Sequence, residues 1–581
     1  MTGAAERTSA RFRAPGPGEA PLPSESVREL LERNARRATD RPAVRFEDTV
    51  LTHVQFLDLS ERWATVLRAH RRTPFHVGVM LDNTPTYLAV LGGAALAGAT
   101  VVGLNPTRRG SNLGRDLLRT NVGVVVTEPA YADVLAPALA ELPATTVLES
   151  VRYGGERTGF GADVDAMVDA STPAPAEDVP LTTIWCLIFT SGTTADPKAV
   201  VCTHRRMLQT GERMRQLLEV TPDDVGYIAM PLFHSNALMV GWMPAVVAGA
   251  TVALARRFSA SRWLDDVRRH GATYFNYTGK PLAYVLATPA RPDDTDNSMV
   301  RGFGNEGSPE AVRVFEQRFG VELIDAFGPT EGAIGIAPDA DTPVGALGRA
   351  GPNLKVVDEH GTERPRARIE GGRLANADDC VGEIVNTAGG GPFEGYWNDP
   401  EANEKATRFG WYWTGDLGYV DDDGFLWFAG RTSDWLRVDG ENFPAAPIER
   451  ALAEHPDVLL AAVYAVPDPA AGDQVMAALV LRPAAEINGA GFAAWLDARD
   501  DIGPKWRPRY LRIAADLPRT ATNKVLVREL QRDKFHLSAT SGDTILVRDR
   551  GDDAYRPFTE ADEAGLAEEF ARHGRERFWE L

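Results

Sequence analysis

Two stretches that share the phrase AGATV decide the fold: "YLAVLGGAALAGATVVGL" at Tyr87–Leu104 and "ALMVGWMPAVVAGATVALA" at Ala237–Ala255. In each, an alanine-rich helical segment runs up to a glycine, and a β-branched run follows. This order predicts a helix, a glycine that ends it, and a buried strand. Membrane-spanning helices are the alternative, since a span needs about 20 mostly apolar residues. The glycines and the repeated pattern favour two similar αβ units instead.

Short apolar runs, including those of the two AGATV units, alternate with helical stretches from about Val27 to Gly430. They read "HVGVML", "ATVVGL", "NVGVVVTEP", "TIWCLIFTSG", "ATVALA", "ATYFNYTG" and "VELIDAFG". Strands that alternate with helices along the chain are typical of parallel sheets covered by helices. We therefore expect this part of the chain to hold parallel sheets.

The pattern changes after Val381. The segments "VGEIVNTAGGGPFEGYW" and "WYWTGDLGYVDDDGFLWFAGR" are rich in glycine and aromatic residues, and Asp423-Gly424 is a turn signal. They predict short antiparallel strands in a barrel-like part. From Ser433 a smaller block follows, with strands "LAAVYAVPD" and "QVMAALVL" and a helix around Phe492–Asp501, which indicates a separate α+β domain.

The predicted fold class is therefore α/β. A large N-terminal domain contains two parallel-sheet αβ subdomains and a small antiparallel barrel-like part, and a small α+β C-terminal domain follows. We predict a flexible leader at 1–26, the N-terminal domain at 27–431 and the C-terminal domain at 434–581. The leader is rich in Pro, Gly and charge and lacks the apolar segment of a signal peptide.

Composition narrows the function classes. The chain has 581 residues, 44% of them hydrophobic, so several cores are expected. Its 81 acidic and 62 basic residues give a net charge of -19, and no long Lys/Arg run is present, which argues against nucleic acid as a partner. The three cysteines, Cys186, Cys202 and Cys380, show neither a disulfide framework nor zinc-ligand spacing. A reducing cytoplasm fits this cysteine usage.

The stretch "FTSGTTADPK" at Phe189–Lys198 has the residue types of a phosphate-binding loop. Hydroxyl groups, backbone N–H groups beside a glycine, and one lysine can together surround phosphate oxygens. The preceding strand, "TIWCLIFT", directs the loop to the edge of a sheet where ligands collect in α/β folds. The GxxxxGK[ST] spacing is absent, however, and an ordinary surface turn uses the same residue types.

Five further motifs follow in order. They are "MPLFHSNALMVG" at Met230–Gly241, "GNEGSP" at Gly304–Pro309, "DAFGPTEG" at Asp325–Gly332, the block Trp411–Glu449 and "PRTATNKV" at Pro518–Val525. With these motifs nearly the whole chain resembles the adenylate-forming superfamily of acyl-CoA synthetases, adenylation domains and luciferases. The segments "DWLRVDGENFPAAPIE" and "YRPFTEAD" are most similar to the branch of fatty-acid-transport proteins, very-long-chain acyl-CoA synthetases and actinobacterial fatty acid-CoA ligases.

The resemblance implies ATP and Mg²⁺ as cofactors and CoA as co-substrate. Glu331 would hold Mg²⁺, which commonly binds one or two carboxylates plus substrate phosphates, and Thr330 would contact the α-phosphate. The other ATP contacts implied are Thr190, Ser191, Gly192, Thr193, Thr194 and Lys198 in the phosphate loop, Gly304, Asn305, Glu306 and Phe327 around the adenine, and Asp416 and Arg431 at the ribose. Solvated turns are the alternative for the lone acidic residues.

Lys524 is the predicted catalytic lysine. As an acid oxygen attacks the α-phosphorus, charge develops on the phosphate oxygens, and a positioned ammonium stabilises that state more than the ground state. A solvated loop lysine is the alternative. His234, Asn276 and Lys280 are assigned to the acid pocket, although a hydrogen-bonded core histidine would also explain His234.

The predicted reaction forms an acid adenylate with release of pyrophosphate and then transfers the acid to a nucleophile. A fatty or aryl carboxylic acid passed to CoA is the leading hypothesis. The alternatives are an ATP-dependent diazotase of secondary metabolism, which would activate nitrite and pass it to an aryl amine acceptor, an enzyme that loads a carrier protein, and a catalytically silent nucleotide-binding protein. The helix, glycine and strand pattern of the two apolar stretches predicts no integral membrane span, and by analogy with the family we expect a homodimer.

Two positions depart from the family pattern. Ala195 stands where the phosphate loop usually has glycine, and a methyl group there restricts the backbone at positive φ. The resemblance also implies a hinge at 432–433 and a mobile C-terminal domain, and Ser433 at this hinge stands where many relatives carry Asp or Lys. Neither change removes a charge that adenylation needs.

Overall fold

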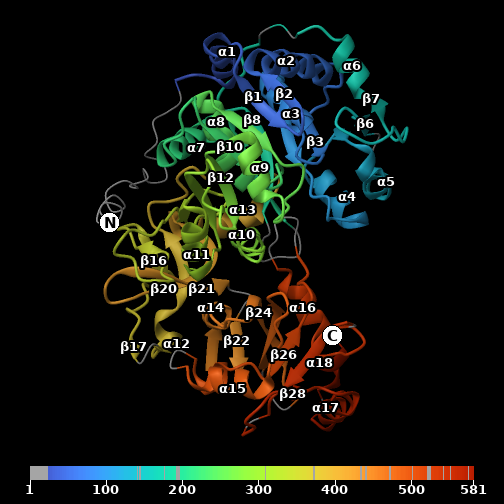
Figure 1. Ribbon diagram of the computed structural model, residues 1–581. Helices are drawn as coiled ribbons and strands as arrows, with labels where there is room; N and C mark the ends of the chain where they lie inside the picture. The colour runs from blue at the N-terminus through green and yellow to red at the C-terminus, as the bar shows by residue number, and fades with distance from the viewer. Residues whose placement is uncertain are drawn as a thin grey trace. The chain divides into compact units, whose positions relative to one another are not determined.

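The computed structural model of the protein forms two compact units (Figure 1). It describes residues 24–140, 142, 145–173, 175, 177–190, 197–307, 309–370, 373–431, 435–438, 441–469, 473–499, 502–519, 525–540, 542–549, 551–573 and 575–580. Unit 1 holds the described residues through Glu306, with Val312–Ala340 and Gly389–Arg408. Unit 2 holds Gly307–Ala311, Asp341–Ala388 and the chain from Phe409 onward.

The predicted domain boundaries stay predictions. The hinge at 432–433 and most of the leader lie outside the described residues. Helix α1 (Val27–Arg37) begins where the leader was predicted to end, because Ser26 caps it. The Ser26 side chain accepts from the Glu29 N–H, and the Glu29 carboxylate accepts from the Ser26 N–H at 2.7 Å. This reciprocal capping pattern is encoded locally in the sequence.

The two AGATV units fold as predicted. Helix α3 (Pro85–Ala97) ends at Gly98 with φ 68°, and strand β4 (Thr100–Gly103) follows. Helix α8 (Met243–Ala248) ends at Gly249 with φ 74°, and strand β11 (Thr251–Leu254) follows. Both glycines adopt the left-handed conformation that side chains disfavour. Among the described residues, no helix combines the length and apolarity that crossing a bilayer requires.

Each AGATV strand enters a different seven-stranded sheet of unit 1. One has the order β7 (Ala162–Asp163), β6 (Thr146–Glu149), β5 (Val124–Thr127), β3 (His76–Met80), β4, β8 (Ile184–Thr190), β9 (Lys198–Thr203). The other has the order β14 (Glu322–Asp325), β13 (Arg301–Asn305), β12 (Tyr274–Thr278), β10 (Val225–Ile228), β11, β1 (Pro42–Phe46), β2 (Thr49–Thr52). All pairs are parallel except at the edge strands β9 and β2. The prediction of parallel sheets is confirmed.

Helices cover these sheets. Besides α1, α3 and α8 they are α2 (His53–Ala69), α4 (Gly110–Arg119), α5 (Ala132–Leu139), α6 (Val164–Ala170), α7 (His204–Leu217), α9 (Trp263–His270), α10 (Gly279–Leu286), α11 (Pro309–Phe319) and α13 (Pro400–Ala406). Between α7 and α8 lies a π-helix, η2 (Asn236–Trp242). On β12, Phe275 packs against Trp263 of α9, while the hydroxyl of Tyr274 donates to the Gly241 carbonyl of η2 at 3.0 Å. Alternate residues of β12 thus face opposite helical layers.

Unit 2 contains an antiparallel sheet and a smaller mixed sheet, as predicted. The antiparallel sheet has the order β15 (Gly348–Arg349), β21 (Phe425–Arg431), β20 (Tyr412–Val420), β19 (Gly382–Asn386), β16 (Leu354–Val357). The mixed sheet has the order β24 (Val458–Pro467), β25 (Asp473–Leu481), β26 (Tyr510–Ile513), β27 (Thr544–Val547), β28 (Arg556–Pro557). Two short hairpins are β17 (Ile369–Glu370) with β18 (Arg373–Leu374) and β22 (Trp435–Val438) with β23 (Glu441–Pro444).

Helices of unit 2 are drawn from gold to red in Figure 1. They are α12 (Ala377–Cys380), α14 (Ala446–Ala453), α15 (Gly489–Asp497), α16 (Val527–Asp533), α17 (Glu560–Arg572) and α18 (Glu576–Glu580). Helix α15 is the helix predicted around Phe492–Asp501, with earlier bounds. The turn predicted at Asp423-Gly424 joins β20 to β21, and Gly424 has φ 86° in this turn.

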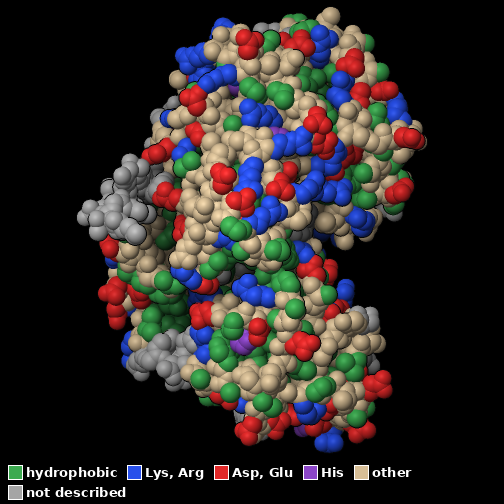
Figure 2. Space-filling view, in the orientation of Figure 1, with side chains coloured by type: hydrophobic (Ala, Val, Ile, Leu, Met, Phe, Trp, Pro, Cys, Tyr) green, Lys and Arg blue, Asp and Glu red, His purple; other side chains and the backbone are tan. Residues whose placement is uncertain are grey.

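Acidic and basic side chains are interspersed over the face seen in Figure 2. Several arginines of unit 1 pair with carboxylates, for example Arg256 with Glu47 at 3.2 Å and Arg268 with Asp293 at 3.1 Å. Such surface pairs add little stability.

A buried histidine makes the stability of unit 1 depend on pH. His204, the first residue of α7, is 2% exposed and its ring stacks on Trp185 of β8 at 5.1 Å. Burial lowers its pKa to about 4, whereas the unfolded chain binds the proton near 6.5. As pH falls from 6.5 to 4, the unfolded state therefore binds a proton that the folded state does not bind. This difference lowers the free energy of unfolding by an amount on the order of 3 kcal/mol.

We expect the His204→Phe variant to show a shallower fall in Tm between pH 6.5 and pH 4 than the wild type. The slope should not vanish, because burial also lowers the pKa values of His53, His76 and His270. Thermal unfolding at a fixed scan rate measures this slope. His360→Gln is the control, since that side chain is 80% exposed. If the slope is unchanged in His204→Phe, groups other than His204 account for the pH dependence of Tm.

Candidate functional site

The predicted phosphate loop joins two antiparallel strands. Thr190 is the last residue of β8, Lys198 is the first of β9, and the two are direct partners in the ladder. Ser191, Gly192, Thr193 and Thr194 lie outside the described residues. The loop is thus a connection between hairpin strands, unlike the strand-to-helix loop of GxxxxGK[ST] proteins.

Thr330 and Glu331 lie on a tight turn that backbone hydrogen bonds close. Phe327 and Ile336 exchange N–H···O bonds of 2.8 and 2.9 Å, and the N–H of Gly332 donates to the Pro329 carbonyl at 2.9 Å. Gly332 has φ 72°, which a glycine adopts without strain. The turn presents a nearly buried carboxylate, because Glu331 is only 7% exposed.

Two neighbouring side chains hold this turn from α7 and from the loop before η2. The hydroxyls of Thr330 and Ser235 are 2.8 Å apart and share a hydrogen bond. The guanidinium of Arg206 donates to the Thr330 carbonyl and, at 2.6 Å, to the Val201 carbonyl of β9. Arg206 thereby ties the turn to the strand that follows the phosphate loop.

Tyr396 connects the phosphate-loop lysine to the carboxylate of the turn. Its hydroxyl donates to Glu331 Oε1 at 2.7 Å, and Lys198 Nζ lies 4.9 Å from the centre of its ring. The backbone around Tyr396 pairs with β9, because the Val201 N–H donates to Gly395 O and the Trp397 N–H to Ala199 O. Sequence analysis assigned this segment to the barrel-like part and missed its role. The structure instead places Gly389–Arg408 in unit 1.

The predicted adenine strand ends at a close packing contact. Gly304 and Asn305 are the last residues of β13, and the exposed Glu306 has a left-handed φ of 65°. A methyl group added to Gly304 would lie 2.5 Å from the ring of Tyr277, so only glycine fits. The Tyr277 hydroxyl donates to Asp325 at 3.1 Å. The strand end is therefore held rigidly by side chains beneath it.

The predicted acid-pocket residues come from three elements. His234 precedes η2 and packs against Phe233 with ring centroids 4.3 Å apart. Asn276 of β12 is 3% exposed and donates at 2.6 Å to Asn236, whose own amide donates to the Tyr277 carbonyl at 3.0 Å. Lys280 lies in the first turn of α10. Asn276 thus holds η2 against the sheet.

An asparagine that sequence analysis did not single out fixes the loop that carries His234. Asn83 follows β3 and is 5% exposed. Its side chain accepts from the Leu232 N–H at 3.0 Å and donates to the carbonyls of Met230 and Ala255 at 2.9 and 3.2 Å. One buried amide thus ties the two sheets of unit 1 together beside the candidate acid pocket.

A narrow apolar pocket lies on the α9, α10 and α11 side of the second sheet. Its walls are Tyr227, Ala229, Met230, Phe258, Trp263, Phe275, Asn276, Tyr277, Pro281, Leu282, Val285 and Phe315. Most of these side chains are aromatic or aliphatic. Its volume is about 10 Å³, room for a single water molecule, so it is a gap within the packed core of unit 1.

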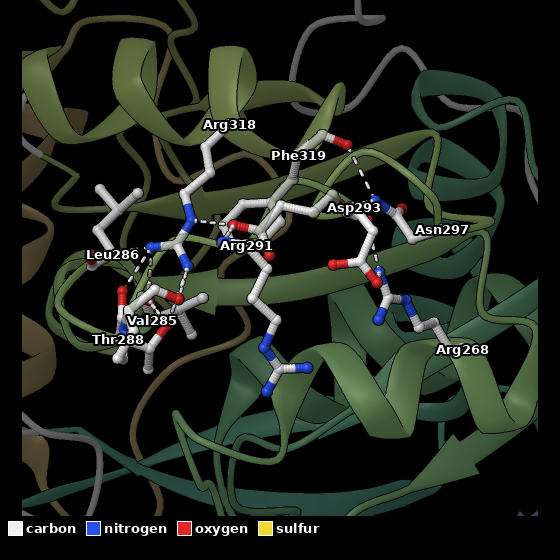
Figure 3. Close-up of polar contacts among 11 residues, drawn as sticks. Arg268, Val285, Leu286, Thr288, Arg291, Asp293, Asn297, Arg318 and Phe319 are labelled. Carbon is white, nitrogen blue, oxygen red and sulfur yellow. Dashed lines mark hydrogen bonds and ion pairs between the residues drawn. The ribbon is translucent and has the colours of Figure 1, made fainter.

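Arg318 of α11 fixes the C-terminal end of α10, which lines this pocket. Its guanidinium donates to the carbonyls of Leu286 and Thr288 at 3.0 and 2.9 Å and pairs with Asp294 at 2.6 Å. Figure 3 shows it reaching across to these groups, with Arg268 and Asn297 holding the rest of the same loop. The last carbonyls of a helix have no partner within the helix, and Arg318 supplies one.

The predicted ribose-binding residues lie in unit 2. Asp416 of β20 is 8% exposed, and Asp416 and Arg431 of β21 are direct cross-strand partners. The Asp416 N–H donates to Thr414 Oγ1 at 3.0 Å, and the preceding Gly415 N–H donates to Glu383 at 2.8 Å. The backbone presenting the aspartate is thus fixed on both sides. Lys524 lies outside the described residues.

The described residues contain no cluster of three or more His, Cys, Asp or Glu side chains placed to hold a metal ion. A magnesium ion does not need such a cluster, because it commonly binds one or two carboxylates and takes its remaining oxygens from phosphates and water. The nearly buried Glu331 carboxylate, with Tyr396 oriented on one of its oxygens, fits that requirement.

Two family models match this chain, and together they cover most of it. Residues 31–397 match the AMP-binding enzyme family, and residues 447–524 match the AMP-binding enzyme C-terminal domain. A steroid-22-oyl-CoA synthetase of Rhodococcus jostii (strain RHA1) is 44% identical over 94% of this chain and 97% of that protein. A medium/long-chain-fatty-acid–CoA ligase of Mycobacterium marinum is 44% identical over 84% of this chain and 92% of that protein.

Solved structures show the same fold. An anthranilate CoA ligase in complex with anthranoyl-AMP superimposes with a TM-score of 0.76 at 22% identity, covering 89% of this chain and 98% of that one. A benzoate CoA ligase from Burkholderia xenovorans LB400 gives 0.74 at 21% identity, covering 87% of this chain and 100% of that one. At this level of identity the likeness concerns the fold alone.

Proposed function

This chain belongs to the AMP-binding enzyme family and is an AMP-forming acyl-CoA ligase, and we propose that its acid is an extended hydrophobic one, a fatty acid or a steroid side-chain acid. In the first step a carboxylate oxygen attacks the α-phosphorus of ATP and pyrophosphate leaves. In the second step the sulfur of CoA attacks the acyl carbon, AMP leaves, and the thiol proton is released.

The observation that carries this substrate class is the similarity of the chain to two relatives at 44% identity, each over more than four fifths of this chain. The relatives that act on a steroid acid and on medium- and long-chain fatty acids support the same class.

Each predicted ATP contact has a proposed role. Lys198 and the hydroxyls of the phosphate loop would bind the terminal phosphates, and Asp416 would accept from the ribose hydroxyls. Magnesium, when bound by Glu331 and the phosphates, would neutralise charge on the phosphate oxygens. Thr330, oriented by Ser235, would donate to the α-phosphate. Lys524 would stabilise the charge that develops during attack.

The diazotase hypothesis has no support from the relatives, which are named for carboxylic acids and CoA. We further propose that the enzyme is cytoplasmic. The supporting observation is that its three cysteines are free and buried, as expected in a reducing compartment: Cys186, Cys202 and Cys380. Sedimentation of the purified chain would test the homodimer.

A substrate panel tests the proposed acid. Purified protein with Mg-ATP and CoA would receive octanoate, palmitate, a steroid side-chain acid, benzoate, or nitrite with an aryl amine, and pyrophosphate release and product mass would be followed. We expect CoA thioesters of the hydrophobic acids. Thioester formation restricted to benzoate would overturn the substrate class, and a diazo product from nitrite would revive the alternative.

A further inference from the structure

We propose that Tyr396 is a positioning residue that keeps the Lys198 ammonium and the Glu331 carboxylate apart, so that both charges remain available to ATP and its metal. This inference rests on the function proposed above. It concerns three side chains of unit 1 that come from β9, from the Pro329–Gly332 turn and from the segment before α13.

The two charged groups use different parts of one tyrosine. The ammonium lies over the ring face, where the aromatic quadrupole attracts a cation, and the carboxylate accepts from the hydroxyl at the ring edge. Among the described residues no salt bridge joins Lys198 to Glu331. In a nearly buried site two such charges would otherwise attract each other strongly. The tyrosine therefore replaces a direct ion pair with two weaker contacts.

A direct ion pair would compete with catalysis. It would direct the Lys198 ammonium at Glu331 instead of a phosphate, and it would occupy the carboxylate oxygens that a metal needs. The hydroxyl bond engages Oε1 and fixes the carboxylate rotamer. Restraint of this kind, from a group behind a metal ligand, typically changes metal affinity.

Tyr396 is well placed to act as a fixed spacer. It is 6% exposed, its backbone forms a bridge with Val200, two residues after Lys198, and Phe393 packs edge-on against its ring at 4.9 Å. Backbone pairing on both sides keeps the ring at a constant position relative to β9. The spacing between the two charges is thus set by the fold and not by side-chain freedom.

Two substitutions separate the roles of ring and hydroxyl. Tyr396→Phe keeps the ring under Lys198 but removes the bond to Glu331, whereas Tyr396→Leu removes both. Tyr131→Phe is the matched control, because the Tyr131 hydroxyl also donates to a carboxylate, that of Asp82, and neither residue is among the predicted ATP contacts. Calorimetry on the full chain would measure equilibrium binding of ATP with excess Mg²⁺ and of ATP with a chelator.

We expect Tyr396→Phe to weaken Mg-ATP binding about 10-fold while metal-free ATP binds as in the wild type. Tyr396→Leu should weaken both, because Lys198 is then drawn to Glu331. Tyr131→Phe should change neither, and Tm would report any shared loss of stability. If Tyr396→Phe binds Mg-ATP as tightly as the wild type, or if Tyr396→Leu binds metal-free ATP as tightly as the wild type, the inference is overturned. The proposed function would still stand. A wild-type protein that neither binds ATP nor releases pyrophosphate would overturn the proposed function and the inference with it.

Discussion

Replacing Lys524 by alanine is expected to slow adenylation by about 10²–10³-fold, the range found when a single preorganised group that stabilises a transition state is removed. The reason is that the ammonium gains interaction as negative charge moves onto the phosphate oxygens, so its loss raises the barrier more than it weakens ATP binding. Isotope exchange between ATP and pyrophosphate in the presence of the acid measures this step. ATP affinity, measured by calorimetry, should stay close to that of the wild type.

The second half-reaction provides the internal control. We propose that the C-terminal domain moves Lys524 away before CoA attacks, so Lys524→Ala should still convert a supplied acyl adenylate and CoA into thioester. Lys355→Ala is a matched surface control in unit 2, because the partly exposed Lys355 of β16 pairs with Glu363. If ATP binding is lost together with exchange, Lys524 serves ground-state affinity and not the transition state.

Glu331→Gln is expected to lower kcat/KM for Mg-ATP by about 100-fold. The amide keeps the shape of the side chain and still offers an oxygen to the Tyr396 hydroxyl, so the turn should stay folded. What it loses is the negative charge that would bind magnesium. Pyrophosphate release, followed as a function of Mg²⁺ at fixed ATP, would show both the lower rate and a higher Mg²⁺ requirement.

Glu401→Gln is the control for that variant. Glu401 lies on α13 in the same unit, is 78% exposed, and pairs with Lys405 at 2.6 Å. Its substitution removes one carboxylate without touching the candidate site. A Glu331→Gln enzyme with the Mg²⁺ dependence of the wild type would exclude Glu331 as the metal-binding carboxylate.

Local patterns in the sequence were sufficient for most of the architecture. The left-handed glycines Gly98 and Gly249, the Ser26 cap and the Asp423-Gly424 turn each use hydrogen bonds or backbone preferences within a few residues. Such features depend on neighbours in the chain, so they can be predicted without the fold. The π-helix η2 was expected only as helix, because its form accompanies contacts to Asn276 and Tyr274 on β12.

The sequence by itself determined the family and the alternation of strands and helices, and it predicted which charged residues contact ATP. Only the tertiary structure showed that Tyr396 links Lys198 to Glu331 and that Asn83 ties two sheets together beside His234. These contacts join residues far apart in the chain, and no local spacing reports them. Long-range packing decides such pairs, because a side chain's partner is set by which strands the whole fold brings together.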